Sequence, residues 1–343
     1  MSLRVTRSRR PATWSGLASA LVFVALLSLP YLVFANVTSL LVNLFILLVL
    51  ATMWNLLAGY AGLVSVGQQA YLGLGAYTVL VLAQNGVNPF LAIPVAIAFC
   101  AVAALPISLL VFRLRNEYFA IGTWVVAEAF QLITVRFPQL GGGTGASLPG
   151  LGGFDPALRQ AFTYWAALAV LAATLLAAYL LLRSRLGLDL TAIRDDEVGA
   201  RSVGVQPARA KRIVYLIAAA GAGGAGALII ISQLNVQAAS VFSVQWSAYM
   251  IFVAVIGGVG TIEGPILGTI LFFTLQQSLA ERGAWYLIIV GTVAVLVAMY
   301  APRGLWGAIS DRFDLRLFPT GYWLHPQGSS PGGLLARLLR RER

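Results

Sequence analysis

Residues 183–212 read RSRLGLDLTAIRDDEVGARSVGVQPARAKR and separate two long apolar runs, residues 161–182 and residues 213–232. This charged segment holds seven of the 23 basic residues and four of the 12 acidic residues, although only 10% of the chain is charged. Each apolar run is long enough, at about 1.5 Å per helical residue, to cross the ~30 Å hydrocarbon core of a bilayer. The pattern predicts membrane-spanning helices joined by a loop that lies in water.

Short helices are expected within the charged segment. Asp189 or Thr191 can accept a hydrogen bond from the free amide groups at a helix start, and Gly204 suits a helix end. The acidic residues at positions 195–197 suit a first helical turn, because the N-terminus of a helix carries partial positive charge. A few apolar residues are scattered among the charges: Leu190, Ile193, Val198 and Val203. Such helices can press these side chains into a groove, which is typical of a docking element, although a solvated loop between two spans has a similar composition.

The composition places the chain in a bilayer. Of its 343 residues, 59% are apolar and the mean hydropathy is +0.85, so the polar surface is too small to cover a soluble core of this size. We expect an all-α, polytopic integral membrane protein with about 8–10 transmembrane helices, some of them interrupted by glycines. The expected domains are a basic cytosolic tail at residues 1–15, a transmembrane domain at residues 16–302 and a basic cytosolic tail at residues 303–343.

The distribution of basic residues predicts the orientation. With both termini in the cytosol, an arrangement of spans can be drawn that leaves only Arg136, Arg159 and Arg282 outside, and the opposite orientation would reverse this asymmetry. The net charge of +11 therefore indicates contact with membrane lipid rather than with nucleic acid. The apolar run at residues 16–35 resembles a secretory signal, but further spans follow at once, so we expect a retained first helix.

The sequence offers few residues for catalysis or metal binding. Cys100 is the single cysteine, His325 the single histidine, and the only lysine, Lys211, is not in a phosphate-binding loop of the G-x-x-x-x-G-K-[ST] type. We expect no catalytic residue, no metal and no cofactor in this chain. If ATP is used, another subunit hydrolyses it.

Residues 55–77, NLLAGYAGLVSVGQQAYLGLGAY, form a second distinctive stretch. Its glycines and polar side chains interrupt a helix, and irregular backbone at membrane depth persists only where it is buried in protein or faces a wet cavity. Tight helix packing remains an alternative, but the paired amides favour a translocation path, because an amide in hydrocarbon needs a partner. The candidate path residues in this stretch are Asn55, Gly59, Ser65, Gly67, Gln68, Gln69 and Tyr71.

Residues 257–265, GGVGTIEGP, interrupt a later apolar region. They add Gly257, Gly258, Gly260 and Thr261 to the candidate path. Glu263 in the same stretch needs a partner if it is buried. Glu128 is also a candidate because it lies within an apolar run, where a carboxylate is either functional or satisfied by an interhelical hydrogen bond or by protonation.

Two other glycine-rich stretches have different expected roles. Residues 220–227, AGAGGAGA, predict a face of small residues that packs against another helix in lipid. Residues 137–162 contain seven glycines and few charges, and they are too long to be a simple turn. The basic-residue count, which leaves Arg136 and Arg159 outside, places this segment on the outer side, and we expect a flexible connector there.

Five segments together resemble one known family. Residues 55–68 resemble its N-L-x-x-G-Y-x-G-x-x-S-x-G-Q pattern, and residues 114–123 its L-R-x-x-Y-F-A-I-x-T pattern. The charged segment GLDLTAIRDDEVGARSVG, the stretch GGVGTIEGP and the exit PRGLWG are similar to three further parts of it. The family is that of ABC importer permeases for branched-chain amino acids, specifically the M-type of their two permease subunits.

The resemblance implies a function and a set of partners. The charged segment would dock on an ATPase through Ile193, Arg194, Asp195, Asp196, Glu197, Arg201 and Gly204. The partners would be a second permease subunit, two ATP-binding subunits and an extracytoplasmic binding protein, all at the bacterial inner membrane. Gly199, Arg201 and Glu263 differ from the residues usual in the family, which leaves partner preference open.

Other functions remain to be distinguished. Urea or a short-chain amide is an alternative substrate. An ion-coupled secondary transporter would need carboxylates or histidines within its spans, and only Glu128 clearly fits. An intramembrane enzyme is disfavoured, because acids, His and Cys do not cluster in the apolar segments.

Overall fold

A computed structural model describes residues 3–6, 23–32, 34–114, 117–279, 285–301, 303–313 and 323–326. Most of both predicted tails, and Arg282, lie outside these described residues. Helices dominate the described chain, and its strands form two short antiparallel pairs, β1 (Leu3–Thr6) with β4 (Trp323–Pro326) and β2 (Ala146–Ser147) with β3 (Asn235–Val236).

The helices follow one another with short connections. The first described helix is Phe23–Leu32, which lies within the run predicted as the first span. The others are α2 (Ala35–Asn55), which continues into a π-helical turn (Leu56–Tyr60), α3 (Gln69–Gln84), α4 (Pro89–Val111), α5 (Glu117–Val135), a 3-10 turn (Pro138–Leu140), α6 (Pro156–Arg183), α7 (Arg185–Asp195), α8 (Glu197–Ser202), α9 (Pro207–Gln233), α10 (Ala238–Val241), α11 (Gln245–Gly257), α12 (Glu263–Leu279), α13 (Trp285–Tyr300) and α14 (Gly304–Phe313).

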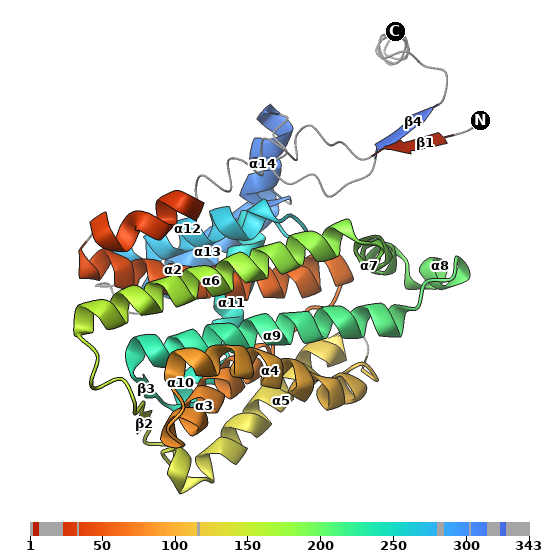
Figure 1. Ribbon diagram of the computed structural model, residues 1–343. Coiled ribbons are helices and arrows are strands. Elements are labelled where there is room, and N and C mark those ends of the chain that lie inside the picture. The colour runs from red at the N-terminus through yellow and green to blue at the C-terminus, as the bar shows by residue number, and fades with distance from the viewer. Residues whose placement is uncertain are drawn as a thin grey trace.

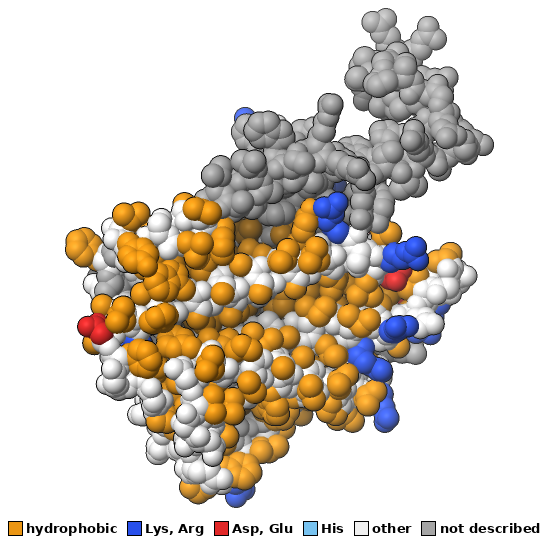
Figure 2. Space-filling view, in the orientation of Figure 1, with side chains coloured by type: hydrophobic (Ala, Val, Ile, Leu, Met, Phe, Trp, Pro, Cys, Tyr) orange, Lys and Arg blue, Asp and Glu red, His pale blue; other side chains and the backbone are white. Residues whose placement is uncertain are grey.

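Six helices of the described chain are long and apolar enough to cross a bilayer: Asn36–Tyr60, Pro89–Val111, Glu117–Val135, Pro156–Arg183, Pro207–Gln233 and Ala238–Gly257. Figure 2 shows hydrophobic side chains covering the flank of the molecule, with most of the visible basic side chains gathered at the end that carries α7 and α8. These features confirm an all-α, polytopic membrane protein.

Helix α9 is the centre of the packing. It lies between α2 and α6 on one side and α3 and α4 on the other (Figure 1). Its small residues let other backbones approach closely: a Cβ on Gly226 would lie 1.8 Å from the Leu72 carbonyl oxygen, and one on Gly75 of α3 would lie 2.1 Å from the Gly223 carbonyl oxygen. The prediction of a small-residue packing face at residues 220–227 is therefore confirmed.

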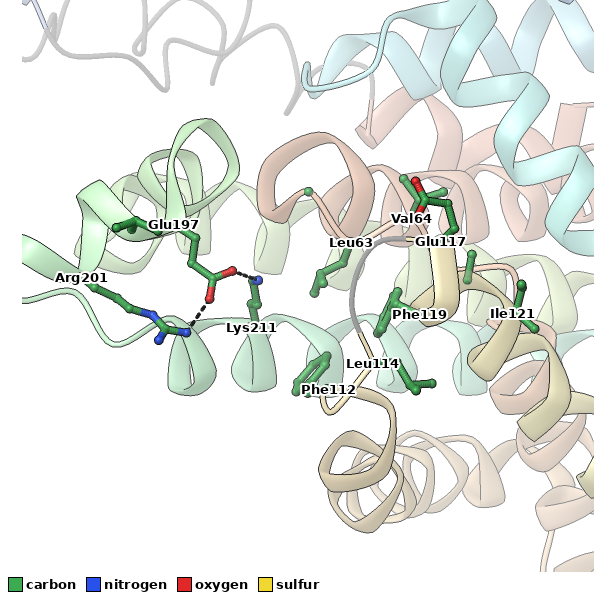
Figure 3. Close-up of a pocket in the computed structure, with 13 residues that line it drawn as sticks. Leu63, Val64, Phe112, Leu114, Glu117, Phe119, Ile121, Glu197, Arg201 and Lys211 are labelled. Atoms are coloured by element: carbon green, nitrogen blue, oxygen red, sulfur yellow. Dashed lines mark hydrogen bonds and ion pairs between the residues drawn. The ribbon is translucent and has the colours of Figure 1, made fainter.

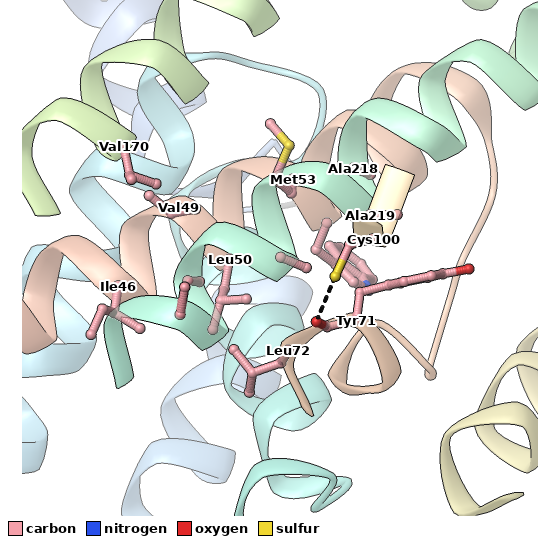
Figure 4. Packing of buried hydrophobic residues seen from close by; sticks show 14 of the residues in the cluster. Ile46, Val49, Leu50, Met53, Tyr71, Leu72, Cys100, Val170, Ala218 and Ala219 are labelled. Carbon is pink, nitrogen blue, oxygen red and sulfur yellow. Dashed lines mark hydrogen bonds between the residues drawn. The ribbon is translucent and has the colours of Figure 1, made fainter. Parts of the chain in front are cut away.

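Larger side chains fill the space around these contacts. Leu50 and Met53 of α2, Leu72 of α3 and Cys100 of α4 are buried together beside α9 (Figure 4). The Cys100 thiol donates a hydrogen bond of 3.4 Å to the Tyr71 carbonyl of α3. The single cysteine is thus a packing residue of the core.

The two ends of the bundle differ in character. The α7–α8 segment projects from one end, whereas the glycine-rich connection and the β2–β3 pair lie at the opposite end (Figure 1). This connection is ordered by bonds to neighbouring elements: Gln84 Nε2 donates to the Gln139 carbonyl over 3.0 Å, and the Leu148 amide donates to the Leu234 carbonyl over 2.9 Å. The charged segment and the glycine-rich connection therefore lie on opposite sides of the bundle, as predicted.

The charged segment forms two helices, but one predicted start is wrong. Helix α7 begins after Ser184, whose hydroxyl accepts from the Leu186 amide, so Asp189 and Thr191 lie inside the helix and do not cap it. The reason is that α6 extends to Arg183 and leaves a single residue for the turn. Gly204, with a φ of +92°, follows α8 and confirms the predicted end.

We predict that Gly226→Ala destabilises the fold by about 1–3 kcal/mol, because its new methyl group overlaps the Leu72 carbonyl and forces α3 from α9. Thermal unfolding of the detergent-purified protein measures this as a lowered midpoint. Gly291→Ala on α13 is the matched control, because no atom lies within 4 Å of its added Cβ. Equal midpoints for the two variants would show that the α3–α9 contact is not tight.

Candidate functional site

Asn55 joins the end of α2 to the connection between α11 and α12. Its Nδ2 donates to the Thr261 carbonyl over 2.8 Å, and its Oδ1 accepts from the Gly260 amide over 2.8 Å. The side chain is almost fully buried. One amide therefore satisfies a donor and an acceptor of an irregular loop that has no helical partners of its own.

Gly59 and Gly260 allow these two segments to touch. A Cβ on Gly59, in the π-helical turn, would lie 2.5 Å from the Gly260 amide nitrogen. Just beyond, Gly62 adopts a φ of +67° and ends the helix, after which the Leu63 amide returns to the Leu57 carbonyl over 3.0 Å. The close approach and the helix end together explain why the sequence has glycines here.

Arg194, near the end of α7, reaches the same place from the charged segment. Its Nη1 donates to the Gly59 carbonyl over 2.8 Å, while its Nε and Nη2 contact Asp195 Oδ1 at 3.0 and 2.9 Å. Gly59 provides one of the last carbonyls of the α2 helix, which lack partners within the helix and carry partial negative charge. The guanidinium therefore caps this helix end.

Two further elements close the junction. A Cβ on Gly304, at the start of α14, would lie 2.3 Å from Gly258 Cα, so the exit segment packs on the same loop. Thr261 Oγ1 accepts from the Gly264 amide over 3.0 Å at the start of α12. We call Asn55, Gly59, Arg194, Gly258, Gly260 and Thr261 the junction, which unites residues predicted separately for docking and for the path.

Glu263 is buried beside the junction, with 7% of its surface exposed. It is the first residue of α12, where the partial positive charge of the helix N-terminus favours a carboxylate. Tyr60 of the π-helical turn lies within electrostatic reach of both Glu263 and Arg194. A buried Glu263 was expected to need a partner. The N-terminus of α12 provides surroundings that favour its negative charge.

The remaining polar residues of the second stretch mostly bond within the protein. The Ser65 carbonyl accepts from Trp54 Nε1 over 2.8 Å, and Gln69 Oε1 accepts from the hydroxyl of Ser247 on α11. The Tyr71 hydroxyl donates to the Tyr215 hydroxyl over 3.0 Å. Their role in a path stays a prediction, and these bonds also give each of them a structural role.

Thr123 is a residue that the sequence reasoning did not select. Its hydroxyl accepts from the Val66 amide over 3.2 Å, and a Cβ on Gly67 would lie 2.0 Å from its carbonyl oxygen. Thr123 thus holds the irregular backbone before α3 against α5. The sequence did contain a signal, because Thr123 is the last residue of the L-R-x-x-Y-F-A-I-x-T pattern at residues 114–123.

Gln68 differs from its neighbours. It is 1% exposed, and neither its Nε2 nor its Oε1 has a hydrogen-bond partner among the described residues. A buried amide without partners is costly. Among the residues of the second stretch, Gln68 is therefore the strongest candidate for a hydrogen bond to a group from outside the chain.

Glu128 lies apart from the junction. It is on α5, the least buried of the six candidate spans, and its Oε1 accepts from Trp124 Nε1 over 3.0 Å. The path residue Gly257, by contrast, is buried where α11 ends, and a Cβ there would lie 1.9 Å from the Gly264 carbonyl oxygen. The structure therefore brings the candidate-path glycines of both stretches to the junction, whereas the Glu128 carboxylate lies elsewhere on α5.

The docking candidates divide into an inner and an outer set. Leu190 and Ile193 of α7 are buried in the chain itself, whereas Val198 and Val203 at α8 are 79% and 78% exposed. Helix α8 itself projects from the end of the bundle (Figure 1). The sequence could not distinguish these two pairs of apolar residues.

Helix α8 is held by its acidic residues. Asp196 Oδ1 accepts from the Val198 amide over 2.9 Å and caps the helix. Glu197 forms ion pairs of 2.6 Å with Lys211 of α9 and with Arg201. The hydrogen bond from Lys211, assisted by Arg201, holds the pKa of the Glu197 carboxyl below its usual value despite partial burial.

A groove of about 980 Å³ lies between α8 and the start of α5. Glu197, Arg201 and Lys211 line one wall, and the side chains of Phe112, Leu114, Phe119 and Ile121 line the other (Figure 3). The connection from the π-helical turn to α3 contributes Leu63 and Val64. Within the described parts of the chain, no group of three or more His, Cys, Asp or Glu side chains gathers as a metal site would require.

Comparison with known proteins decides the family. Residues 36–298, most of the chain, match a family described as the permease component of branched-chain amino acid transport systems. The chain belongs to this permease family. The resemblance seen in the sequence is thereby confirmed.

Two curated relatives extend the comparison. The high-affinity branched-chain amino acid transport system permease protein LivM of Escherichia coli (strain K12) is 29% identical over 316 residues, which cover 83% of this chain and 74% of the relative. The LivM protein of Salmonella typhimurium (strain LT2) is 29% identical over 278 residues, which cover 73% of this chain and 65% of the relative. No solved structure matches the permease.

We predict that Asn55→Leu in this permease loosens the junction. The substitution leaves the Gly260 amide and the Thr261 carbonyl without their partner, at a cost of roughly 1–3 kcal/mol for each buried group. Hydrogen exchange should become faster at Gly260, more than in the α3–α9 contact. Asn85→Leu is the control, because Asn85 is exposed at the far end of α3. Unchanged protection at Gly260 would contradict the clamp.

Proposed function

We propose that this permease is one subunit of an ABC importer that moves branched-chain amino acids across the bacterial inner membrane. An extracytoplasmic binding protein delivers the amino acid, a second permease forms the other half of the path, and two ATP-binding subunits supply the energy. The chain itself carries no cofactor and hydrolyses no ATP. Both termini and the α7–α8 segment lie in the cytosol.

One observation carries this proposal beyond family membership. The α7–α8 segment is fixed to the membrane domain by Leu190, Ile193 and Arg194, whereas Val198, which also lines the groove beside α5, and Val203 are left highly exposed. Two highly exposed apolar side chains on a projecting helix lose unfavourable contact with water when a partner covers them. The basic residues around them support a cytosolic position.

Two acidic residues of the segment also bond within the chain. Asp196 caps α8 and Glu197 pairs with Lys211, so both already have partners within the chain. The side chains of Asp195 and Arg201, 69% and 64% exposed, are more accessible than that of Glu197. We infer that the valines anchor the ATPase and that these two accessible charges guide its approach.

We predict that Val198→Asp combined with Val203→Asp prevents association with the ATP-binding subunits, because two anchors become charged groups that resist dehydration. Co-purification from membranes and ATP-driven uptake of leucine should both fall by about tenfold or more.

The control for this prediction is Val87→Asp, the same substitution at an exposed valine at the opposite end of the bundle. It should leave association unchanged. If the double variant still co-purifies with its ATP-binding subunits at the wild-type level, α8 is a connector and the proposed docking fails.

A second subunit is supported by the contrast between α4 and α5. The exposed side chains of α4 are apolar, among them Leu91, Val95, Val102 and Leu109, and they suit lipid. The exposed face of α5 carries the Trp124–Glu128 pair. Glu128 lies 11 residues, or about 16 Å, from the start of this 19-residue helix. A carboxylate at this depth is costly in lipid, so we infer that a protein surface covers this face of α5.

We predict that Glu128→Leu weakens co-purification of the second permease, whereas Glu128→Gln, which keeps an acceptor for Trp124, largely retains it. Val102→Ala on the exposed face of α4 should have no effect.

Uptake by wild type and by Glu128→Gln should persist when a protonophore collapses the proton gradient at constant ATP. Uptake that stops with the gradient in wild type would instead favour an ion-coupled secondary transporter.

A further inference from the structure

The family resemblance groups Arg194 with the ATPase contacts, but its guanidinium bonds the Gly59 carbonyl of the membrane domain. Nη1 bonds the Gly59 carbonyl at 2.8 Å and lies 3.4 Å from the position of a Cβ on Gly260. The aliphatic part of the side chain lies against Gly62, whose added Cβ would be 3.4 Å from Arg194 Cγ. The residue therefore contacts both irregular segments at once.

The contacts of Arg194 are directional. A guanidinium donates in a fixed planar fork, and here one arm reaches Gly59 while the opposite edge is held by Asp195. Asp195 thus fixes the orientation of the group from its exposed side. A lysine would supply a single flexible ammonium and would not hold both directions together.

The segments on the far side of Arg194 are rigidly connected. Asn55 bonds both Gly260 and Thr261, and Gly59 touches Gly260 at a distance that leaves no room for a side chain. On the near side, the buried Leu190 and Ile193 fix α7 to the bundle. A displacement of α7 must therefore either move the end of α2 together with the α11–α12 connection or break these contacts.

We propose that Arg194 is a positioning residue that passes movement of the docking segment to the helix break of α2 and to the α11–α12 connection. This inference rests on the proposed function, because the movement comes from closure of the ATP-binding subunits on α8. Arg194 contacts no ATPase in this scheme. It makes the end of α2 and the α11–α12 connection move together with α7.

The test compares transport with ATP consumption in proteoliposomes that contain the complete importer and its binding protein. Arg194→Ala removes the link to Gly59 while Val198 and Val203 stay in place. We expect the ATP-binding subunits to remain associated and ATP to be hydrolysed, with leucine taken up per ATP reduced by about tenfold or more. Arg194→Lys should give an intermediate ratio.

Arg209→Ala is the matched control, because Arg209 is an exposed arginine of the same charged segment. Its uptake per ATP should equal that of wild type. A wild-type ratio in Arg194→Ala would overturn the inference, and so would loss of the ATP-binding subunits from that variant when it is folded, since Arg194 would then belong to the docking surface. If Arg194→Ala yields no folded complex, Arg194→Lys decides, and a wild-type ratio there overturns the inference.

Failure of the proposed role of Arg194 can be distinguished from failure of the proposed docking at α8. Retained association in the Val198→Asp, Val203→Asp variant refutes docking at α8, whatever Arg194 does. Lost association in that variant, together with normal coupling in Arg194→Ala, refutes only the role of Arg194.

Discussion

A backbone polar group inside a bilayer must find its hydrogen-bond partner within the protein, because lipid offers none. The end of α2 and the α11–α12 connection are both irregular, and each therefore depends on side chains from elsewhere. Asn55 supplies a donor and an acceptor to the connection, and Arg194 supplies a donor to the Gly59 carbonyl. The two broken helices and the charged segment consequently form one unit, since none of the three is satisfied alone.

Close packing by glycine is the second constraint. Helices in lipid gain little from hydrophobic burial against one another, so association depends on contact between well-fitted surfaces. In α9, Gly223 and Gly226 bring its backbone against that of α3. The same device operates at Gly59 and Gly260, where the packed surfaces are a π-helical turn and a loop rather than two regular helices. One type of residue thus serves a rigid core and a junction of irregular segments.

The sequence predicted those features that depend on local composition. Apolar runs predicted the membrane helices, the glycine run at residues 220–227 predicted a packing face, and the glycine at position 204 predicted a helix end. It did not predict that Asn55, Arg194 and Gly260 meet, because they are far apart in the chain and their contact depends on how the helices pack. For the same reason it could not separate the buried Ile193 from the exposed Val198, since both are apolar residues among charges. The start of α7 was misplaced because Ser184 was hidden at the end of a long apolar helix.

The α7–α8 segment combines a firmly held helix with a more loosely held one. Helix α7 is held by buried side chains and by Arg194, whereas α8 is held by its cap at Asp196 and by the Glu197 ion pairs, which are partly exposed. Exposed ion pairs contribute only about 0–1 kcal/mol, and the groove beside α8 leaves space for it to shift against α5. Helix α8 can therefore adjust to a partner at little cost. A displacement that exceeds this adjustment reaches α7, which is held more firmly. From there Arg194 leads into the membrane helices by a directional contact, because its side chain bonds the end of α2 at Gly59.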